Sequence, residues 1–307
     1  MLMLLGLALP MAILGFAIQD SDDDNEDTVE LTGTDEADRF EGGEGDDFLD
    51  GMAGDDVMNG RAGDDTIFGR EGDDILQGED GDDMLCSGDG NDIITGNTGQ
   101  DLIEGQGGDD WVSGDYGWDT VRGDAGNDTV LGGRGGDFVE GGEGDDVLFG
   151  GIIEGIPLNL DEMTDLRDGA SLSDLNGGVE LRDDRFVDTL MGGEGDDDMV
   201  VGSNDIANGG DGSDTYHVMS DQFDPNAGAS IRNFDTDEDA ITIIVDDTSA
   251  DYELTVTDEG NDAVIRMGDD VLATVMNRAG QIAVEDITLI AENTIEAMFD
   301  PNGAVAA

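Results

Sequence analysis

The chain has 307 residues, of which 78 are acidic and 11 are basic, all of them arginine, so that its formal charge is −67. This charge leaves no basic patch to meet phosphate, which excludes nucleic acid and anionic lipid as partners. Such a charge with low hydrophobicity is typical of disorder unless a bound cation offsets it. The single Cys86 excludes an internal disulfide.

The first element is an apolar segment at residues 1–19, unbroken from Met1 to Ile18, and an acidic linker follows at residues 20–32. Eighteen residues lie at the short limit for a helix that spans a bilayer. No Lys or Arg precedes Arg39 and no clear cleavage site follows the segment, so a typical export signal is not indicated. We expect a short hydrophobic helix that anchors the chain to a membrane. An atypical export signal and a misassigned start of the chain are open alternatives.

Twelve consecutive nine-residue repeats run from Gly42 to Phe149 without a change of register. Place one is glycine except at Ser87, place four is always glycine, place six is always aspartate, and place eight is always aliphatic or Met. The glycines permit positive φ and close approach of a neighbouring backbone. One apolar side chain flanked by variable residues fits a strand with one buried face. Each repeat is therefore predicted to be a turn and a short strand, in a domain at residues 33–151.

These repeats resemble the pattern G-G-x-G-x-D-x-U-x, where U is a large apolar residue, of the repeats-in-toxin (RTX) family of hemolysin-type calcium-binding proteins. The resemblance implies an all-β fold, namely a parallel β-roll solenoid in which two repeats make one coil. It also implies calcium as the cofactor. The predicted metal ligands in this region are the aspartates at place six: Asp47, Asp56, Asp65, Asp74, Asp83, Asp92, Asp101, Asp110, Asp119, Asp128, Asp137 and Asp146.

The charge of the repeats also favours calcium as the bound ion. From Gly42 to Phe149 there are 30 acidic residues and four arginines, a net charge of −26 in a narrow roll. Carboxylate and carbonyl oxygens are the ligands that calcium prefers, and ions shared by turns two repeats apart would give about ten or more sites. The alternative is the solvated acidic surface of a salt-adapted protein. Seven repeats also carry Asp at place five, such as Asp46, which we interpret as surface charge.

The repeat pattern stops after Gly151, and residues 152–182 are predicted to be an insertion with a short helix near Asp161 to Arg167. The repeats resume weakly at Asp188 and continue through residues 183–218. Gly192 and Gly209 are 17 residues apart, one fewer than two repeats, and we expect a turn to absorb the difference because a one-residue slip would turn core side chains outward. Three further metal ligands are predicted here: Asp197, Asp205 and Asp214.

Longer alternating strands are predicted from Ser220 onwards, at residues 230–234, 241–245, 252–256, 263–266, 271–275 and 286–290. We expect them to form an antiparallel β capping domain at residues 219–292, because an open solenoid exposes a coil edge, and residues 293–307 to form a tail. This segment resembles the domain that follows the last repeat in many secreted RTX proteins. Asp235, Asp237 and Asp239 imitate the start of an EF-hand, but Ala240 replaces its glycine.

No catalytic residues are predicted. His217 is the only histidine, which excludes an H-E-x-x-H zinc site, and neither G-x-S-x-G nor C-x-x-C occurs. We interpret His217 as structural and Cys86 as a variable surface residue. Trp111, Tyr116 and Trp118 occupy outward places, where they either stack on sugar rings or pack against a loop or the insertion.

The sequence thus predicts a non-enzymatic, calcium-binding extracellular β-roll with a structural or adhesive role at a bacterial cell surface. Its expected partners are calcium ions and, beyond them, cell-surface components or a type I secretion exporter. Two other functions stay open. One is a secreted enzyme or toxin-like effector with its active site in the insertion or the cap, and the other is a passenger module for type I secretion.

Overall fold

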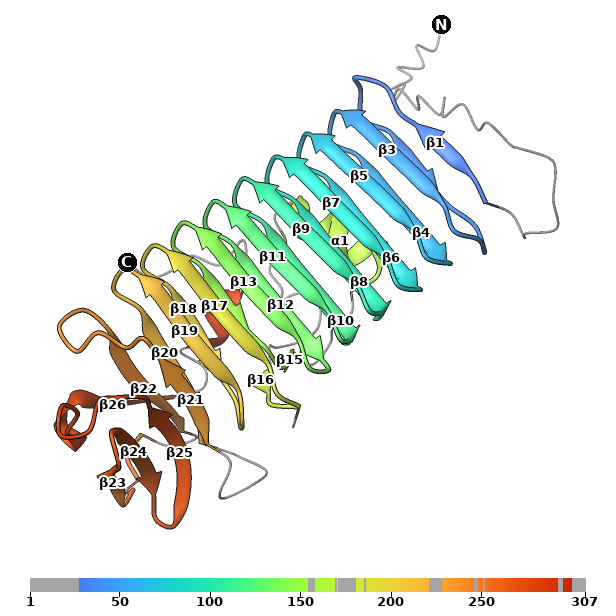
Figure 1. Cartoon of the computed structure of the whole chain (residues 1–307). Coiled ribbons are helices and arrows are strands. Elements are labelled where there is room, and N and C mark those ends of the chain that lie inside the picture. Colours follow the sequence, from blue (N-terminus) through green and yellow to red (C-terminus); the bar gives the residue numbers. More distant parts are fainter. Residues whose placement is uncertain are drawn as a thin grey trace, which may run out of the picture.

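The computed structural model of the chain describes residues 28–153, 158–168, 170, 181–184, 186–220, 228–245, 248–250, 252–291 and 295–299. Two parallel sheets face each other, and the chain winds between them as a solenoid whose coils are stacked in sequence order (Figure 1). The predicted β-roll is therefore confirmed. The hydrophobic helix expected at residues 1–19 lies outside the described residues.

One sheet has thirteen strands, in the order β1-β3-β5-β7-β9-β11-β13-β17-β19-β21-β25-β24-β23. Their bounds are β1 (Glu30–Thr32), β3 (Phe48–Ala53), β5 (Thr66–Glu71), β7 (Met84–Asp89), β9 (Leu102–Gly107), β11 (Thr120–Ala125), β13 (Phe138–Glu143), β17 (Thr189–Glu194), β19 (Ile206–Asp211), β21 (Ala229–Arg232), β25 (Asp270–Val275), β24 (Asp262–Met267) and β23 (Leu254–Glu259).

The other sheet has eleven strands, in the order β2-β4-β6-β8-β10-β12-β14-β18-β20-β22-β26. Their bounds are β2 (Arg39–Glu41), β4 (Val57–Ala62), β6 (Ile75–Asp80), β8 (Ile93–Gly99), β10 (Trp111–Gly117), β12 (Thr129–Arg134), β14 (Val147–Phe149), β18 (Asp198–Val201), β20 (Thr215–Met219), β22 (Ala240–Val245) and β26 (Ile287–Ala291).

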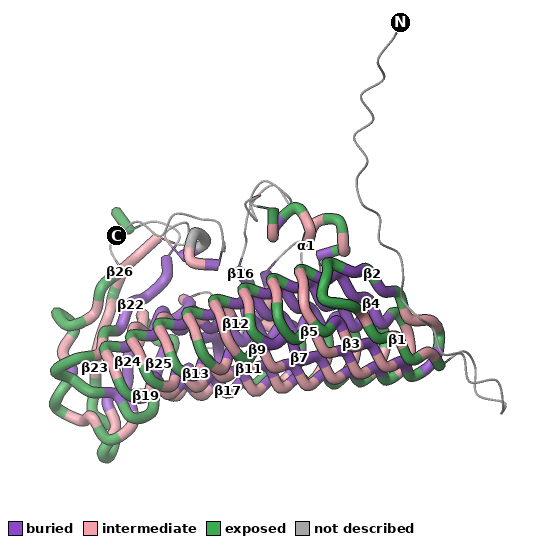
Figure 2. The backbone as a smooth tube through the Cα atoms, turned by 90° about the horizontal axis from the view of Figure 1, so that it is seen from above, coloured by how far each residue is buried: buried purple, intermediate pink, exposed green. Residues whose placement is uncertain are grey.

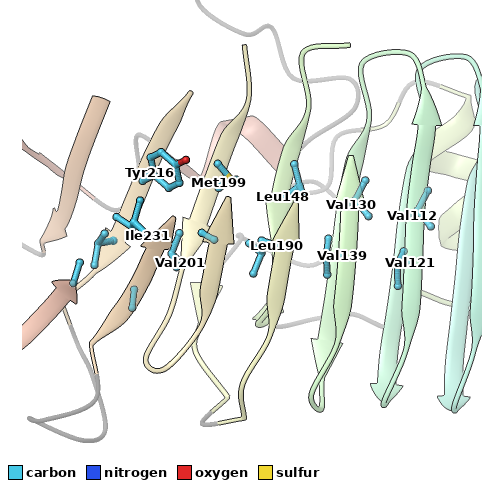
Figure 3. Packing of buried hydrophobic residues seen from close by; sticks show 14 of the residues in the cluster. Val112, Val121, Val130, Val139, Leu148, Leu190, Met199, Val201, Tyr216 and Ile231 are labelled. Carbon is cyan, nitrogen blue, oxygen red and sulfur yellow. The ribbon is translucent and has the colours of Figure 1, made fainter. Parts of the chain in front are cut away.

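The nine-residue period fixes the core. Each repeat strand pairs in parallel with the strand two repeats away, so that Ile67 aligns with Leu85 in one sheet and Ile94 with Val112 in the other. The place-eight side chains therefore line the space between the two sheets and are completely buried. Figure 3 shows part of this row of buried side chains, including Val121 and Val139. Because every repeat contributes one core residue, the register is fixed along the whole roll.

The outer face of the eleven-stranded sheet is also covered. The insertion forms α1 (Leu160–Arg167), whose Asn159 side chain caps the backbone N–H groups of Asp161 and Glu162. Figure 2 shows α1 resting on the outside of the roll. A 3₁₀ helix, η2 (Glu296–Phe299), covers another part of this face, where the Trp111 indole N–H donates to the Phe299 carbonyl at 3.1 Å. Outward apolar side chains thus form a second core.

The insertion and the short spacing leave the stacking intact. A two-stranded antiparallel pair, β15 (Ile152–Ile153) and β16 (Leu181–Arg182), stands at the base of the insertion. Beyond it, β17 pairs with β13 in the same parallel register as before. The residue missing between Gly192 and Gly209 is taken up in the turn at residues 202–204, after β18, and the core residues of β17 and β19 stay inside. The predicted absorption in a turn is confirmed.

The C-terminal segment continues the roll more than the sequence led us to expect. All six predicted strands form, but β21, β22 and β26 extend the two parallel sheets, and only β23, β24 and β25 pair antiparallel. The expected antiparallel cap is therefore only partly correct. The physical reason is that Ile231, Ile241 and Ile243 keep the inward alternation of the repeats and join the same core. The short 3₁₀ helix η1 (Val284–Asp286) precedes β26. Among the described residues, no helix is long and apolar enough to cross a membrane.

Candidate metal centre

The place-six aspartates stand in two straight rows, one along each turn edge of the roll. The first row lies in the turns that lead into the eleven-stranded sheet: Asp38, Asp56, Asp74, Asp92, Asp110, Asp128, Asp146, Asp197, Asp214 and Asp239. The second row lies in the turns that lead into the thirteen-stranded sheet: Asp47, Asp65, Asp83, Asp101, Asp119, Asp137, Asp188 and Asp205. The structure thus aligns all fifteen sequence-predicted ligands.

Within a row, each carboxylate is tied to the backbone of its neighbour. The Asp110 backbone N–H donates to Oδ1 of Asp128 at 2.8 Å, and Oδ1 of Asp110 in turn accepts the N–H of Asp92. The same bond recurs nine times along the first row and seven times along the second, at 2.7 to 3.2 Å. These charge-assisted bonds fix the orientation of each side chain.

The second carboxylate oxygen, Oδ2, is left without a donor. In fourteen row members it is buried and has no hydrogen-bond partner in the described part of the chain: Asp56, Asp65, Asp74, Asp83, Asp92, Asp101, Asp110, Asp119, Asp128, Asp137, Asp146, Asp188, Asp197 and Asp214. Burying an unpaired carboxylate oxygen is costly unless a cation or a donor offsets it. The repetition of one unsatisfied atom in coil after coil therefore indicates a repeated cation site.

Glycine at place one leaves room for these oxygens. A Cβ on Gly105 would stand 2.5 Å from Oδ2 of Asp110 and 2.7 Å from the carbonyl oxygen of Gly123, which lies two repeats on. A carboxylate oxygen and a carbonyl oxygen from successive coils therefore converge on one small space that a side chain would fill. Oxygen-only ligands from flexible turns fit calcium better than a metal that requires nitrogen or sulfur.

The carboxylates at the ends of the rows differ from those inside. Oδ2 of Asp38 accepts the backbone N–H of Thr34, and Oδ2 of Asp47 accepts that of Gly43. At the other end, Asp205 accepts the N–H of Gly202 and Asp239 that of Asp235. Each end carboxylate thus finds its donor within its own turn. The interior carboxylates differ in this respect, since no donor in the described part of the chain reaches their Oδ2 atoms.

Burial shifts the ionisation of the rows. Loss of solvent, followed by the charge of neighbouring aspartates, raises the pKa of Asp110 to about 9 and that of Asp74 to about 8. The same causes raise the pKa of Asp65 to about 7. The described residues contain no group of three or more His, Cys, Asp or Glu side chains placed to hold a metal.

Comparison with known families agrees with this geometry. The family model of the RTX calcium-binding nonapeptide repeat, which spans four copies, matches residues 32–67, 59–94, 95–130, 122–152 and 181–205. The chain thus carries RTX calcium-binding nonapeptide repeats. Its repeats are therefore calcium-binding repeats, and the predicted cofactor is supported at that level. No curated protein matches the chain.

Among solved structures, the chain is similar to the extracellular lipase LipA from Serratia marcescens, at 17% identity and a TM-score of 0.23. The match covers 66% of this chain and 40% of the lipase, so the chain spans less than half the length of that protein.

The RTX pattern in the sequence missed three row members. Asp38, Asp188 and Asp239 occupy the same position as the predicted ligands. The turns before Asp188 and Asp239 lack the usual glycines, and the turn before Asp38 keeps only Gly33. A signal was available, because Asp38 precedes Asp47 by nine residues, and Asp188 and Asp239 each stand two residues before a core residue, Leu190 or Ile241. Counting the period outward from the strict repeats would have found Asp38.

The place-five aspartates have other partners. Oδ1 of Asp109 accepts the backbone N–H of Asn127 in the next coil, and Oδ1 of Asp46 accepts that of Asp64. These side chains are exposed, unlike those at place six. Their oxygens are accessible to water, which favours the interpretation of place five as surface charge.

The other residues considered in the sequence, His217, Cys86, Trp111 and Trp118, differ in how far they are buried. His217 is buried, with Nδ1 2.7 Å from Thr242 Oγ1 and Nε2 2.9 Å from Asp198 Oδ1, as a structural histidine would be. The prediction that Cys86 is a surface residue is wrong, because the side chain is only 6% exposed. Its thiol points at the Glu104 carboxylate, and burial raises the pKa of the thiol to about 11. Trp111 is buried under η2, whereas Trp118 is 66% exposed.

The raised pKa values predict that protonation of the rows at low pH partly substitutes for calcium in stabilising the folded chain. In the fold the pKa is about 6 for Asp92, about 7 for Asp65 and about 9 for Asp110, against about 3.8 for an ordinary Asp. Folding without metal is therefore favoured below pH 4, and that stabilisation is lost as pH rises through 6 to 9. In a chelator, far-ultraviolet circular dichroism should show more β structure at pH 4 than at pH 8.

The aspartates of the unfolded chain are already ionised above pH 6, so loss of the protonated, metal-free fold should raise the calcium concentration at half-folding as pH rises from 6 to 8. A chelated protein that gains β structure on going from pH 4 to pH 8 would contradict the burial of ionisable rows described here.

Proposed function

We propose that this chain is a non-enzymatic, extracellular RTX protein that folds on binding calcium and has a structural or adhesive role at a bacterial cell surface. The observation that carries the proposal is the two rows of buried carboxylates with unpaired Oδ2 atoms. A roll that buries so many like charges is stable only if cations enter with them. Calcium binding and folding are then one process.

We assign one calcium position to each of the fourteen interior carboxylates with an unpaired Oδ2. The ligands are that Oδ2 and turn carbonyl oxygens, such as Gly123 O beside Asp110. The predicted ligands Asp47 and Asp205 then serve as ends of the rows, where local N–H groups take the place of an ion. Asp188, which the sequence did not predict as a ligand, belongs to the interior set.

The proposed location follows from the expected affinity. Sites of the weak extracellular type, with dissociation constants of about 10⁻⁴ to 10⁻³ M, are empty in cytoplasm and filled outside the cell. A chain whose turns require filled sites would fold after export. A rigid rod with a charged surface suits display at the cell surface. The only histidine and the only cysteine are both buried, and the sequence contains no catalytic motif that would suggest a reaction.

The first test is folding itself. In chelator at neutral pH the full-length chain should give a coil-like far-ultraviolet spectrum, and calcium at about millimolar concentration should convert it cooperatively to β structure. Magnesium should substitute poorly, because it requires a tighter octahedral shell. A β spectrum that is unchanged by chelator at pH 8 would sink the proposal. Hydrolase activity lost on deleting residues 152–182 would instead favour an enzyme.

Adjacent aspartates provide a matched pair for the ligand assignment. Asp110→Asn removes the charge from an interior Oδ2, whereas Asp109→Asn makes the same change one residue earlier, at an exposed place-five side chain. We expect the first variant to raise the calcium midpoint about twofold or more and to reduce cooperativity, because neighbouring coils stabilise one another. The second should match the unchanged protein within error. Equal midpoints for both variants would show that the assignment is wrong.

Membrane anchoring by residues 1–18 is a separate proposal. As a helix, this run would be about 27 Å long, close to the thickness of the hydrocarbon core. Full-length protein should stay with membranes after a high-salt wash and be cut by protease added to intact or outer-membrane-permeabilised cells. A chain that begins at Asp20 should be released into the soluble fraction. Protease-protected full-length protein in the cytoplasm would overturn both the anchor and the extracellular role.

A further inference from the structure

A group of side chains outside the carboxylate rows lies where β10 and β12 approach the second turn edge. A cavity of about 370 Å³ opens here on the outer face of the eleven-stranded sheet, lined among others by Ser113, Asp115, Tyr116, Gly133, Arg134 and Arg182. It lies beside the base of the insertion, since Ile152 and Ile153 of β15 also line it. Neither the repeat pattern nor calcium binding explains these residues.

The cavity exists because side chains are missing from one column of the sheet. Asp115 aligns with Asn97 in the preceding coil and with Gly133 in the following one. Gly151 also lines the cavity, so two glycines leave space beside the Asp115 carboxylate. The space is thus a local departure from the repeat and not a feature of every coil.

Asp115 itself lacks a partner for half of its carboxylate. The side chain is 5% exposed, and Oδ1 accepts the Ser113 hydroxyl at 2.7 Å. Oδ2 is buried and has no hydrogen-bond partner among the described residues. Asp115 stands at place two of its repeat, away from both rows. An unpaired buried acceptor that lines a cavity is suited to a ligand that brings hydrogen-bond donors.

Tyr116 and Arg134 also line a second, shallower hollow of about 730 Å³, together with Trp118, Phe186, Gly117 and Gly135. Trp118 is 66% exposed, and Tyr116 and Phe186 are nearly half exposed. The Trp118 ring lies against Gly135 of the next coil, where a Cβ would stand 3.1 Å from Cδ1. Aromatic surface gathered in this way is typical of a recognition site.

The acidic pattern of the edge changes at this point. Place five along the second turn edge is Asp46, Asp64 and Asp82 in the first three coils, and then Gln100 and Trp118. The aromatic hollow therefore replaces the solvated carboxylates of the earlier coils. Arg134 makes no direct ion pair among the described residues, although its charge acts on the nearby Asp184 carboxylate, and its guanidinium lines the same hollow as the rings.

We propose that the two hollows form one saccharide-binding site, with Asp115 and Arg134 as hydrogen-bonding groups and Trp118 with Tyr116 as the stacking platform. A pyranose ring presents an apolar C–H face and a rim of hydroxyl groups, so it matches exposed rings next to an unpaired carboxylate. A lipid surface is disfavoured by the charge of −67. A cationic peptide would meet Asp115 but also two arginines, Arg134 and Arg182.

The inference rests on the proposed surface role and gives it a ligand class, namely cell-surface or matrix glycans. Neutral and acidic sugars share the ring and hydroxyl chemistry that the site recognises. The site lies on turns that the proposed calcium ions order, so saccharide binding should require calcium.

Tryptophan fluorescence provides a selective test, because Trp118 is 66% exposed and Trp111, the only other tryptophan, is 1% exposed. Acrylamide should therefore quench Trp118 almost alone in the calcium-loaded, full-length chain. The probes are cellohexaose, maltohexaose and chitohexaose as neutral sugars and hexagalacturonate as an acidic one. We expect at least one probe to lower the quenching constant severalfold.

Calorimetry with the binding probe then tests the residues. Trp118→Ala and Asp115→Asn should each weaken binding about tenfold or more. Met52→Ala, a change at an exposed apolar residue on the first coil of the strict repeats, is the matched control and should leave the affinity unchanged. All three variants should keep the calcium midpoint of folding and the number of bound calcium ions.

Three results would overturn the inference: no probe binds at millimolar concentration, Trp118→Ala and Asp115→Asn bind as tightly as Met52→Ala, or Asp115→Asn loses one calcium per chain. The last result would assign the cavity to an ion. Calcium-dependent folding is measured independently by circular dichroism and surface location by protease accessibility. If both hold and no sugar binds, the saccharide site fails while the proposed function stands.

Discussion

Carboxylates buried in rows are the constraint on which the rest of this structure depends. Each coil brings an aspartate next to those of the coils before and after it, and one oxygen of each interior carboxylate has no donor among the residues that the structure describes. Like charges in a medium of low polarity repel one another strongly. The glycines, the fixed register and the short strands all keep these oxygens pointing at small spaces between successive coils, where the proposed calcium ions would bind.

Much of the roll could be predicted, because two periods in the sequence have direct physical meaning. Aspartate at every ninth residue fixes the turns, and one apolar residue two places later fixes the buried face of each strand. Leu190 and Ala207 remain in the core across an irregular spacing, since burial of these side chains is more favourable than regularity of the turn. The six C-terminal strands were equally readable from alternation, although their pairing was not.

What escaped prediction depends on contacts that no period records. The alternation shows that Trp111 and Cys86 point away from the interior of the roll, but it does not show what covers the outer face. Trp111 is buried because η2 lies over it, and Trp118 is exposed because it stands in a turn. Asp188 was missed as a member of its row for a related reason: it follows the insertion, where the glycine pattern is absent and only its place in the stack identifies it.

The way in which the roll accommodates its insertion has a wider consequence. The backbone N–H of Asp137 binds Oδ1 of Asp188 across 51 residues at 2.8 Å, the same distance as bonds between coils that are 18 residues apart. Closing a longer loop adds little entropic cost, because that cost grows only with the logarithm of loop length. Evolution or a protein engineer can therefore splice a new segment into one turn without disturbing the stack. The turn edge is thus a place where a further segment can be added while the register of the stacked coils is kept.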